Sequence, residues 1–281
     1  MIIMKYKGGL GNQMFQYAAA ISCAKRLGVQ VKFDHSFFTK RYAKTRAYTM
    51  GIFGIKPDSV KDYRINIYWK LRRYKEFKRF LGLNIYKQKG FAYSETFEEI
   101  TDNTFMTGSF QSAKYFDEEL IRSKLVFRKY PRGLNAQYAE KISSCNSVSL
   151  HIRRGDYVQK ARNQKLYNHL DMEHYNKAKQ IIESQVENPV YFVFSDDIKW
   201  SKENIKLDNA HYIGHNSGEN SWEDMRLMSL CKHNITANSS FSWWGAYLNS
   251  NPEKIVVCPK LWFMDDSKNT SDVAPKEWIL L

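Results

Sequence analysis

Three polar clusters in the 281-residue sequence carry residue types that can bind or transfer a charged group. The first, HIRRGD, runs from His151 to Asp156 and contains Arg153, Arg154 and Gly155. A guanidinium offers a planar fork that fits two phosphate oxygens, and glycine allows the backbone to approach a ligand closely. We therefore expect Arg153 and Arg154 to bind a phosphate-bearing ligand. A structural Arg–Asp pair at a strand end is the alternative.

The other two clusters are rich in carboxylates and hydroxyls. Ser195, Asp196 and Asp197 end an apolar run. The two carboxylates can accept hydrogen bonds from a base or a ribose, or they can cap a helix, and Ser195 is a candidate cap for a helix starting at residue 196. Ser239 and Ser240 precede a predicted helix. Hydroxyls and unpaired backbone N–H groups at a helix start form a site suited to a phosphate.

A glycine loop near the N-terminus and several absent motifs narrow the chemistry. The loop GGLGNQ contains Gly9, Gly11, Asn12 and Gln13, and its spacing fits neither the GxGxxG nor the Walker pattern. The sequence has no Asp-x-Asp, and none of its seven histidines forms an HExxH motif. We therefore expect no bound metal and no cofactor, and we expect protein cations to neutralise a diphosphate.

The elements around these clusters alternate between strand and helix. Residues 1–6 form an apolar run, residues 14–27 are strong helix formers that end at Gly28, and residues 29–33 alternate like a second strand. This order of strand, glycine loop, helix and strand is typical of a parallel sheet. Residues 113–120 are expected to form a further helix.

A second alternation begins after Pro131. Strand 147–152 has apolar residues on one face and His151 and Arg153 on the other. Ligands of such sheets bind beyond the carboxyl ends of the strands, where the clusters lie. We expect two α/β domains, residues 1–130 and 131–281, with a cleft between them. Further predicted strands are 189–194, 210–213, 234–237 and 254–258, and predicted helices are 136–142, 175–184, 222–230 and 242–248.

Composition places the chain among globular proteins of one large or two modest domains. Hydrophobic residues make up 43% and aromatic residues 15% of the sequence, which argues against disorder and coiled coil. No stretch approaches the roughly 18 to 20 apolar residues of a transmembrane helix, and the start MIIMKYKGGL does not resemble a secretory signal. We therefore expect a cytoplasmic protein.

The formal net charge of +14 is partly concentrated in one stretch. Residues 61–89 contain ten basic and two acidic residues, so +8 lies here, and apolar residues recur at three- and four-residue steps. Such a pattern is typical of a helix packed on its own domain, or of a basic amphipathic helix on an anionic membrane surface. No nucleic-acid recognition motif occurs, so we expect no nucleic-acid partner.

Two kinds of conspicuous residue are expected to serve packing. Trp243 and Trp244 follow the serine cluster directly and are expected in the core. The cysteines form no CxxC pair, which favours four reduced, mostly buried thiols over disulfides or a zinc site. They are Cys23, Cys145, Cys231 and Cys258.

Four motifs, in order along the chain, resemble glycosyltransferase family 11, the α-1,2-fucosyltransferases. They are GGLGNQMFQYA, HIRRGDY, FSDD and DMRLMSLCKHNITANSSFSWWGAYLN, and the similarity spans residues 5–262. The resemblance implies a GT-B-like α/β fold, in which two Rossmann-type domains, an N-terminal acceptor-side domain and a C-terminal GDP-sugar-binding domain, face a cleft. It also implies inverting, metal-independent transfer of L-fucose from GDP-β-L-fucose to the 2-hydroxyl of a terminal galactose in a surface glycan or oligosaccharide.

The same resemblance implies roles for individual residues. Arg153 is implied to bind the β-phosphate and to stabilise the charge on departing GDP, with Arg154 and Asp156 supporting that geometry. No carboxylate occurs in residues 158–162, so Asp156 is the candidate base and Asn12 an orienting group. The other residues implied to bind the donor are His151 with one of Asp196 and Asp197 at the guanosine, Ser239 and Ser240 at the phosphates, and Gly9, Gly11 and Gln13 from the N-terminal domain.

Three functional hypotheses follow. The first is a cytoplasmic galactoside α-1,2-fucosyltransferase, peripheral at the inner membrane if residues 61–89 bind it. The second is a transferase of another GDP-sugar or another linkage. The third is a non-enzymatic basic protein that binds a membrane or a polyanion. The sequence does not name the acceptor, which is expected to depend on N-terminal loops including residues 34–50 and 90–110.

Overall fold

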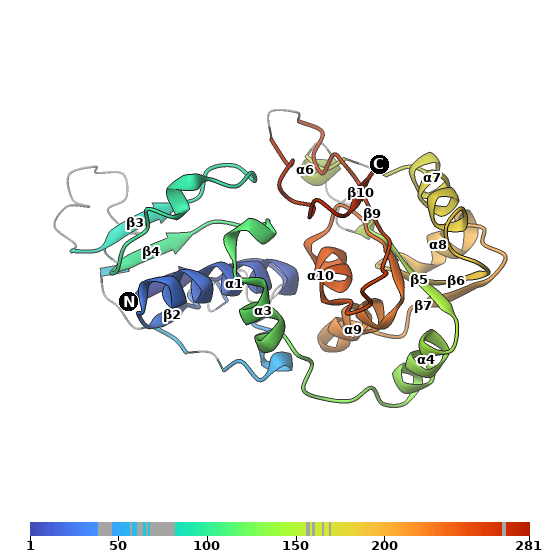
Figure 1. Cartoon of the computed structure of the whole chain (residues 1–281), viewed down its shortest axis with the longest axis horizontal. Coiled ribbons are helices and arrows are strands. Elements are labelled where there is room, and N and C mark those ends of the chain that lie inside the picture. The colour runs from blue at the N-terminus through green and yellow to red at the C-terminus, as the bar shows by residue number, and fades with distance from the viewer. Residues whose placement is uncertain are drawn as a thin grey trace. The chain divides into compact units, whose positions relative to one another are not determined.

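The chain forms two compact α/β units, here called unit 1 (Met1–Arg128) and unit 2 (Lys129–Leu281). The boundary lies beside the one expected after residue 130. Each unit contains a parallel sheet with helices packed against it (Figure 1). The computed structural model describes residues 1–38, 47–56, 58–60, 64–65, 67, 82–155, 158, 161–164, 166–168, 170–265 and 268–281.

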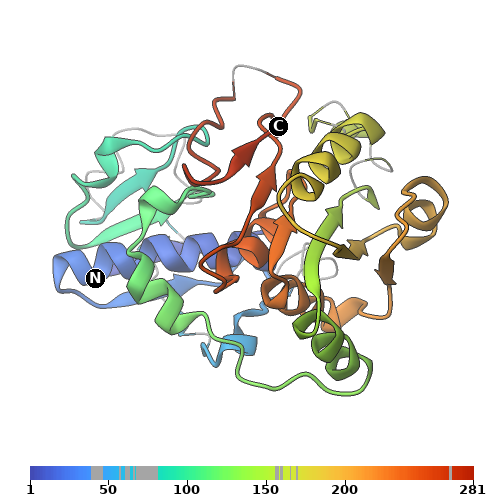
Figure 2. The same cartoon turned by 45° about the vertical axis from the view of Figure 1, so that its right-hand side comes forward.

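Unit 1 has a four-stranded parallel sheet in the order β2-β1-β4-β3. Strand β1 (Ile2–Lys5) pairs with β2 (Val31–Asp34) and β4 (Thr104–Thr107), and β4 also pairs with β3 (Asn84–Lys87). Helix α1 (Leu10–Leu27) lies along one face of this sheet (Figures 1 and 2). The remaining elements are η1 (Met50–Phe53), η3 (Glu95–Phe97), η4 (Ala113–Tyr115) and α3 (Glu118–Lys124).

Helix α1 shows why the glycine loop leads directly into a helix. Most of its residues are buried, including the apolar Met14, Phe15 and Ala18, which is typical of a helix enclosed by its own domain. Gly28 ends the helix in the left-handed conformation (φ 65°), and its N–H donates to carbonyl groups of the last turn. The predicted helix is confirmed, although it begins at Leu10 rather than at residue 14.

Unit 2 has a six-stranded parallel sheet in the order β10-β9-β8-β5-β6-β7. Counted from β5 as the first strand, this is the strand order of the Rossmann fold, and its switch point lies between β5 and β8. The strands are β5 (Asn146–Ile152), β6 (Pro189–Ser195), β7 (Ala210–Ile213), β8 (His233–Ile235), β9 (Val256–Cys258) and β10 (Ile279–Leu280). The helices are α4 (Leu134–Ser143), α6 (Ala161–Gln164), α7 (Met172–Glu183), α8 (Ile198–Asn204), η5 (Gly218–Asn220), α9 (Trp222–Leu230) and α10 (Ser240–Leu248).

Both faces of this second sheet are covered by helices (Figures 1 and 2). Val148, Leu150 and Ile152 of β5 pack with residues of α7 on one face. Residues of α4 and α9 pack on the other face, where Phe241 also lies. The His151 ring lies 6.0 Å from the Phe241 ring, so the predicted alternation of β5 is confirmed.

Several predicted elements need correction. Residues 113–120 do not form one helix, because Phe116 is extended and Asp117 caps a separate helix, α3. The short strands β3, β4 and β10 were not predicted. The basic segment 61–89 lies largely outside the described residues, and its final part contains the strand β3 rather than a helix.

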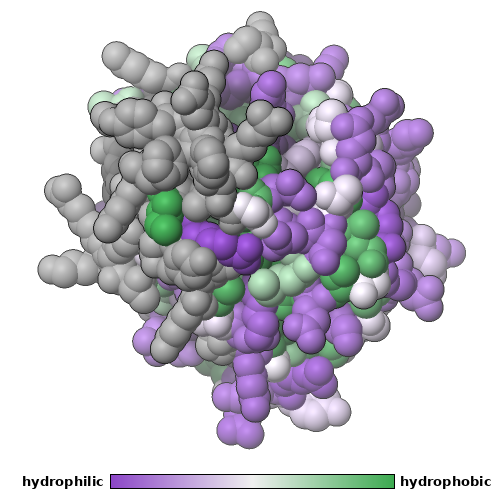
Figure 3. Space-filling model, turned by 90° about the vertical axis from the view of Figure 1, so that its left-hand side faces the viewer, coloured by the Kyte–Doolittle hydropathy of each residue, from purple (hydrophilic) through white to green (hydrophobic). Residues whose placement is uncertain are grey.

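The packing residues behave as predicted where they are described. Trp243 and Trp244 are fully buried, and all four cysteines are free thiols, three of them buried. On the face shown in Figure 3, the described hydrophobic side chains form small groups between hydrophilic ones. Among the described residues, no helix combines the length and apolar character needed to span a membrane.

Candidate active site

The carboxyl ends of β5 and β8 bring two of the three polar clusters to the switch point of the unit 2 sheet. Arg153 follows β5 directly, and Ser239 lies four residues after the end of β8. The third cluster follows β6, which pairs with β5 so that Ile152 stands opposite Ser195. This edge of the sheet is where parallel α/β folds bind their ligands.

Asp196 is the central carboxylate of this edge. Its Oδ2 lies 2.7 Å from Nη1 of Arg153, and its Oδ1 accepts hydrogen bonds from the backbone N–H groups of Arg154 and Gly155, at 2.8 and 2.9 Å. The side chains of Arg153 and Asp196 are 24% and 26% exposed, so the pair is accessible to a ligand. Asp196 thereby orients both the guanidinium and the loop that follows β5.

Gly155 is required by this arrangement. A Cβ atom at this position would lie 2.6 Å from Oδ2 and 2.9 Å from Cγ of Asp196. Any larger residue would displace the carboxylate that orients Arg153. The glycine of the HIRRGD motif thus serves the close approach of the loop to Asp196.

Arg154 has partners of its own. Its guanidinium carbon lies 3.7 Å from the centre of the Trp200 ring, and its Nε lies 3.7 Å from Oδ2 of Asp197. Asp197 also caps α8 by accepting a hydrogen bond from the Trp200 N–H. The cap of this helix is therefore Asp197 and not Ser195, because Ser195 is still the last residue of β6. Trp200, which fixes Arg154 by a cation–π contact, was not singled out from the sequence.

His151 is a neutral group at the end of β5. It is 5% exposed, and burial lowers its pKa to about 4, an effect that nearby Asp196 opposes and Arg153 reinforces. Its Nδ1 is buried and has no hydrogen-bond partner in the described part of the chain. Buried polar atoms are normally paired, so this nitrogen suits a ligand that offers a hydrogen bond.

The start of α10 provides hydroxyl and backbone N–H groups. Ser239 is the N-cap of the helix, and its hydroxyl accepts a hydrogen bond from the Phe241 N–H. A hydroxyl that accepts one bond can still donate its own hydrogen to a phosphate oxygen. Ser240 opens the helix and is partly buried. Asn238 ties the neighbouring loops together by donating to the carbonyl groups of Asn168 and Trp262.

The glycine loop of unit 1 lies at the carboxyl end of β1. Gly9 is the N-cap of α1 and offers no side-chain cap, and Gly11 lies in the first turn. The Oδ1 of Asn12 accepts a hydrogen bond of 2.7 Å from Gln111, which follows β4. Gly8 has a φ of +81°, and a Cβ atom there would lie 2.8 Å from the Asn12 amide nitrogen. The loop therefore needs glycine for both its conformation and its contact with Asn12.

Gln13, which the resemblance places near the donor, is buried within unit 1. The residue is 0% exposed, and its amide donates to the carbonyl groups of Gly8 and Ala47 and accepts from the Thr49 N–H. All of its hydrogen bonds thus serve the backbone around it. Gln16 acts similarly, because it joins the Lys7 N–H to the Gly108 carbonyl and so links the loops after β1 and β4.

One partly buried acid was not found from the sequence. Asp224, in the first turn of α9, accepts a hydrogen bond of 2.8 Å from Asn216. Burial raises its pKa to about 7; the Asn216 hydrogen bond opposes this, and Glu223 adds to it. The start of α9 follows β7 and so lies at the same edge of the sheet as Arg153. Strongly shifted acids are common at functional sites.

Two predictions are only partly addressed by the structure. Asp156, the candidate base, lies outside the described residues. Within the described ranges, no group of three His, Cys, Asp or Glu residues is arranged to bind a metal ion. The candidate donor residues thus fall into a unit 2 set around Arg153 and a unit 1 set around Asn12.

The fold and this edge define a two-unit α/β protein of the GT-B class, with Rossmann-type strand order in unit 2. Over 90% of the chain, the structure is similar to the crystal structure of NodZ alpha-1,6-fucosyltransferase soaked with GDP-fucose. The TM-score is 0.52, the sequence identity is 15% and the similarity covers 96% of that chain. At this identity the similarity concerns the fold alone.

The chain belongs to glycosyl transferase family 11, which it matches over residues 1–281, and it is therefore a glycosyltransferase. It is 34% identical to the O-antigen biosynthesis glycosyltransferase WbnK of Escherichia coli, over 98% of both chains. It is 31% identical to an alpha-1,2-colitosyltransferase of Escherichia coli, over 99% of this chain and 98% of the other. It is 26% identical to galactoside alpha-(1,2)-fucosyltransferase 1 of Ateles belzebuth, over 86% and 63% respectively.

Proposed function

We propose that the protein is a galactoside α-1,2-fucosyltransferase that transfers L-fucose, with inversion, from GDP-β-L-fucose to the 2-hydroxyl of a terminal galactose. The observation that carries this proposal is the Arg153–Asp196 pair at the switch point of a chain that belongs to family 11. The name of the Ateles belzebuth relative supports the linkage and the galactose acceptor.

In this proposal Arg153 stabilises the reaction electrostatically. Its guanidinium binds the β-phosphate and stabilises the negative charge that develops on GDP as the bond to the sugar breaks. Asp196 keeps the guanidinium oriented before the donor arrives, so little reorganisation is needed during the reaction. Arg154, stacked on Trp200, supports the same loop.

The start of α10 binds the diphosphate from the other side of the switch point. The Ser239 and Ser240 hydroxyls and the N–H groups of the first turn donate to phosphate oxygens, and the helix dipole adds to this attraction. His151, neutral at pH 7, faces the guanosine with its Nδ1. No step in this scheme needs a metal, so metal independence is part of the proposal.

The acceptor hydroxyl is activated weakly in this scheme. Asp156 is the candidate base, and Asn12 from unit 1 orients the hydroxyl. Gly9 and Gly11 allow the acceptor or the fucose to approach the start of α1 closely. Cytoplasmic localisation, with peripheral membrane association through residues 61–89, also remains a proposal.

A second donor is favoured by a specific observation. The relative named alpha-1,2-colitosyltransferase matches nearly the whole chain at 31% identity. Colitose is the 3-deoxy form of L-fucose, so the two donors differ in one hydroxyl. A site that forms a hydrogen bond with this hydroxyl discriminates strongly against the deoxy sugar. A site that forms no hydrogen bond with it accepts both sugars.

GDP release tests the proposal. The protein is incubated with a panel of β-galactosides and with GDP-fucose, GDP-colitose or GDP-mannose, in excess chelator, and the product linkage is determined. We expect GDP-fucose to be used and an α-1,2 linkage to form. Turnover with GDP-colitose alone would identify GDP-colitose, and not GDP-fucose, as the donor. Absence of turnover with every donor and acceptor would refute the proposed function.

A further inference from the structure

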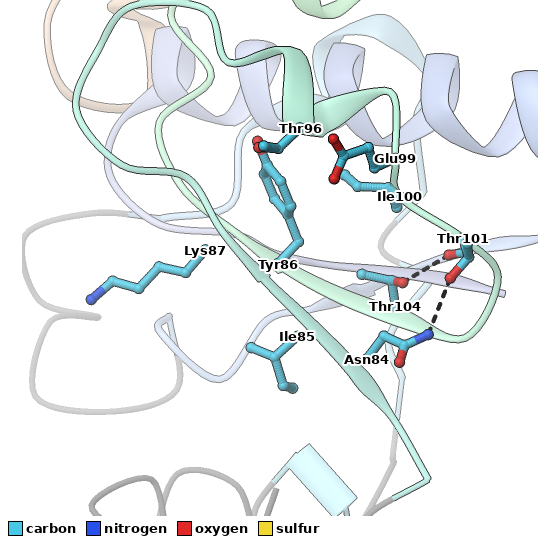
Figure 4. A pocket seen from close by; sticks show the side chains of 9 residues that line it. All are labelled: Asn84, Ile85, Tyr86, Lys87, Thr96, Glu99, Ile100, Thr101 and Thr104. Atoms are coloured by element: carbon cyan, nitrogen blue, oxygen red, sulfur yellow. Dashed lines mark hydrogen bonds between the residues drawn. The ribbon is translucent and has the colours of Figure 1, made fainter. Parts of the chain in front are cut away.

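A pocket of about 390 Å³ lies along strand β3 in unit 1 (Figure 4). None of the residues assigned above to the donor or to the acceptor hydroxyl lines it. Its volume is within the range of small-molecule sites and is sufficient for a sugar ring. Its polar lining comes from Asn84, Tyr86 and Lys87 of β3, from Thr96, Glu99 and Thr101 of the segment before β4, and from Thr104 of β4.

The Tyr86 hydroxyl is an unsatisfied group of this pocket. It is buried and has no hydrogen-bond partner among the described residues. The ring is fixed by Phe97 and Phe110, with ring centres 6.2 and 6.3 Å away, and the side chain extends toward Thr96 in Figure 4. A buried hydroxyl without a partner is unfavourable, so a ligand that supplies a hydrogen bond here is favoured.

The end of the pocket formed by Asn84, Thr101 and Thr104 is ordered by its own hydrogen bonds. The Asn84 amide donates to the Thr101 hydroxyl at 3.2 Å, and the Thr104 hydroxyl donates to the Thr101 carbonyl at 2.7 Å (Figure 4). These bonds fix the side chains before a ligand binds, which lowers the entropic cost of binding.

The two charged residues of the pocket favour a neutral ligand. Lys87 and Glu99 are exposed, and neither forms an ion pair within the part of the chain that the structure describes. The Lys87 side chain points away from Tyr86 and Glu99 in Figure 4, so the Glu99 carboxylate is the charged group that faces a ligand, and it accepts hydrogen bonds from the hydroxyls of a sugar. A polyanion would be repelled by Glu99.

The direction of the pocket connects it with the glycine loop. The pocket follows β3 from its first residue, Asn84, to its last, Lys87, a path of about 10 Å at the usual rise of a strand. Because the sheet is parallel, the carboxyl end of β3 lies at the same edge as the start of α1. A glycan whose terminal sugar lies at that edge can therefore extend along β3.

We infer that this pocket is a carbohydrate subsite that binds a neutral inner sugar of the acceptor glycan. The inference rests on the proposed function, because it takes the terminal galactose to lie at the carboxyl edge. Tyr86 and Glu99 are its specificity-determining residues. Acceptors longer than a monosaccharide gain affinity there, and GDP does not bind it.

Binding measurements test the inference without relying on turnover. Saturation-transfer NMR titrations compare methyl β-galactoside, a neutral galactose-terminated tetrasaccharide and GDP, each with wild type, Tyr86→Phe and Glu99→Gln. We expect each substitution to raise the Kd of the tetrasaccharide about fivefold, the value of one hydrogen bond, and to leave the other two Kd values unchanged. Thermal melting is expected to be unchanged for Tyr86→Phe, because the hydroxyl it removes has no partner.

Tyr6→Phe is the matched control. Tyr6 also lies in unit 1 and also carries a buried hydroxyl without a partner, but it is 0% exposed and does not line the pocket. We expect wild-type Kd values for this variant. The inference is overturned if wild type binds the tetrasaccharide no better than the monosaccharide, or if Tyr86→Phe and Glu99→Gln behave like Tyr6→Phe. A protein that binds the glycans as expected but transfers no sugar contradicts the proposed function instead.

Discussion

Replacing Arg153 with alanine is expected to reduce kcat/KM about 100-fold while leaving the fold intact. The ion pair with Asp196 is about one quarter exposed, so its loss costs the fold about 1 kcal/mol or less. The backbone N–H groups of Arg154 and Gly155 still bind Asp196 in the variant. Loss of a charged contact to the departing group costs roughly 3 kcal/mol of transition-state stabilisation, which is about 100-fold in rate.

Asp196 makes this prediction more specific. Two like charges roughly 6 Å apart repel by about 3 kcal/mol at an effective dielectric constant of 20. In Arg153→Ala the uncompensated Asp196 carboxylate is therefore expected to disfavour a phosphate bound at this edge. Asp196→Asn removes the charge but keeps an oxygen for the two backbone N–H groups. If the Asp196→Asn substitution relieves only half of this repulsion, the reaction rate still rises about tenfold. The double variant is therefore expected to be roughly tenfold more active than Arg153→Ala.

Initial rates of GDP release across a donor concentration series give kcat/KM for both variants, and thermal melting reports the fold. Arg122→Ala is the control, because it also removes an arginine that pairs with a carboxylate, Glu118, but in unit 1. It is expected to retain wild-type kinetics. The reasoning is refuted if Arg153→Ala keeps nearly wild-type kcat/KM, or if the double variant is no faster than Arg153→Ala.

Two further substitutions test the loop after β5 and the partly buried acid of α9, Asp224. Gly155→Ala places a Cβ atom 2.6 Å from Asp196, so we expect a loss of roughly 1 to 3 kcal/mol in stability and at least tenfold in kcat/KM. Gly51→Ala, where an added Cβ atom would meet no atom within 4 Å apart from the neighbouring backbone, is expected to be neutral in both assays, and equal behaviour of the two variants would contradict this account. The folded-state pKa of Asp224, about 7, lies above its ordinary value of 3.8, so the folded state binds this proton more tightly. The free energy of unfolding should therefore fall, relative to Asp224→Asn, as the pH rises from 4 to 7, by at most about 1.4 kcal/mol per pH unit, and then level off. Denaturant titrations across this pH range measure the difference, and parallel curves for the two proteins would rule the effect out.

Most of unit 2 could be predicted from the sequence because its strands are covered on both faces. β6, for example, is a continuous apolar run, and such runs are recognisable without knowledge of their neighbours. The predicted bounds of β7 and α9 are confirmed without change. Local patterns were sufficient here, since each element carries its own apolar face or run.

Unit 1 was harder to predict because its later strands are short and mixed. β3 and β4 have four residues each and begin and end with polar residues, so neither forms an apolar run that can be recognised from the sequence alone. They become strands by pairing with each other and with β1. β10, only two residues long, depends in the same way on its pairing with β9.

The sequence by itself determined which chemical groups are present and the order in which they follow their strands. The arginines and glycine of HIRRGD and the serines before α10 occupy positions set by local spacing, because a strand end or a helix start depends on neighbouring residues. The family resemblance drawn from these motifs is confirmed over the whole chain.

Only the tertiary structure decided which groups are partners. Asp196 binds Arg153 and the loop after β5, because β5 and β6 lie side by side although their ends are more than 40 residues apart. Gln13, which the resemblance places near the donor, is enclosed by backbone groups that come from distant residues such as Ala47 and Thr49. Hydrogen-bond partners of this kind arise from strand adjacency and burial, which are properties of the folded chain and not of any local segment.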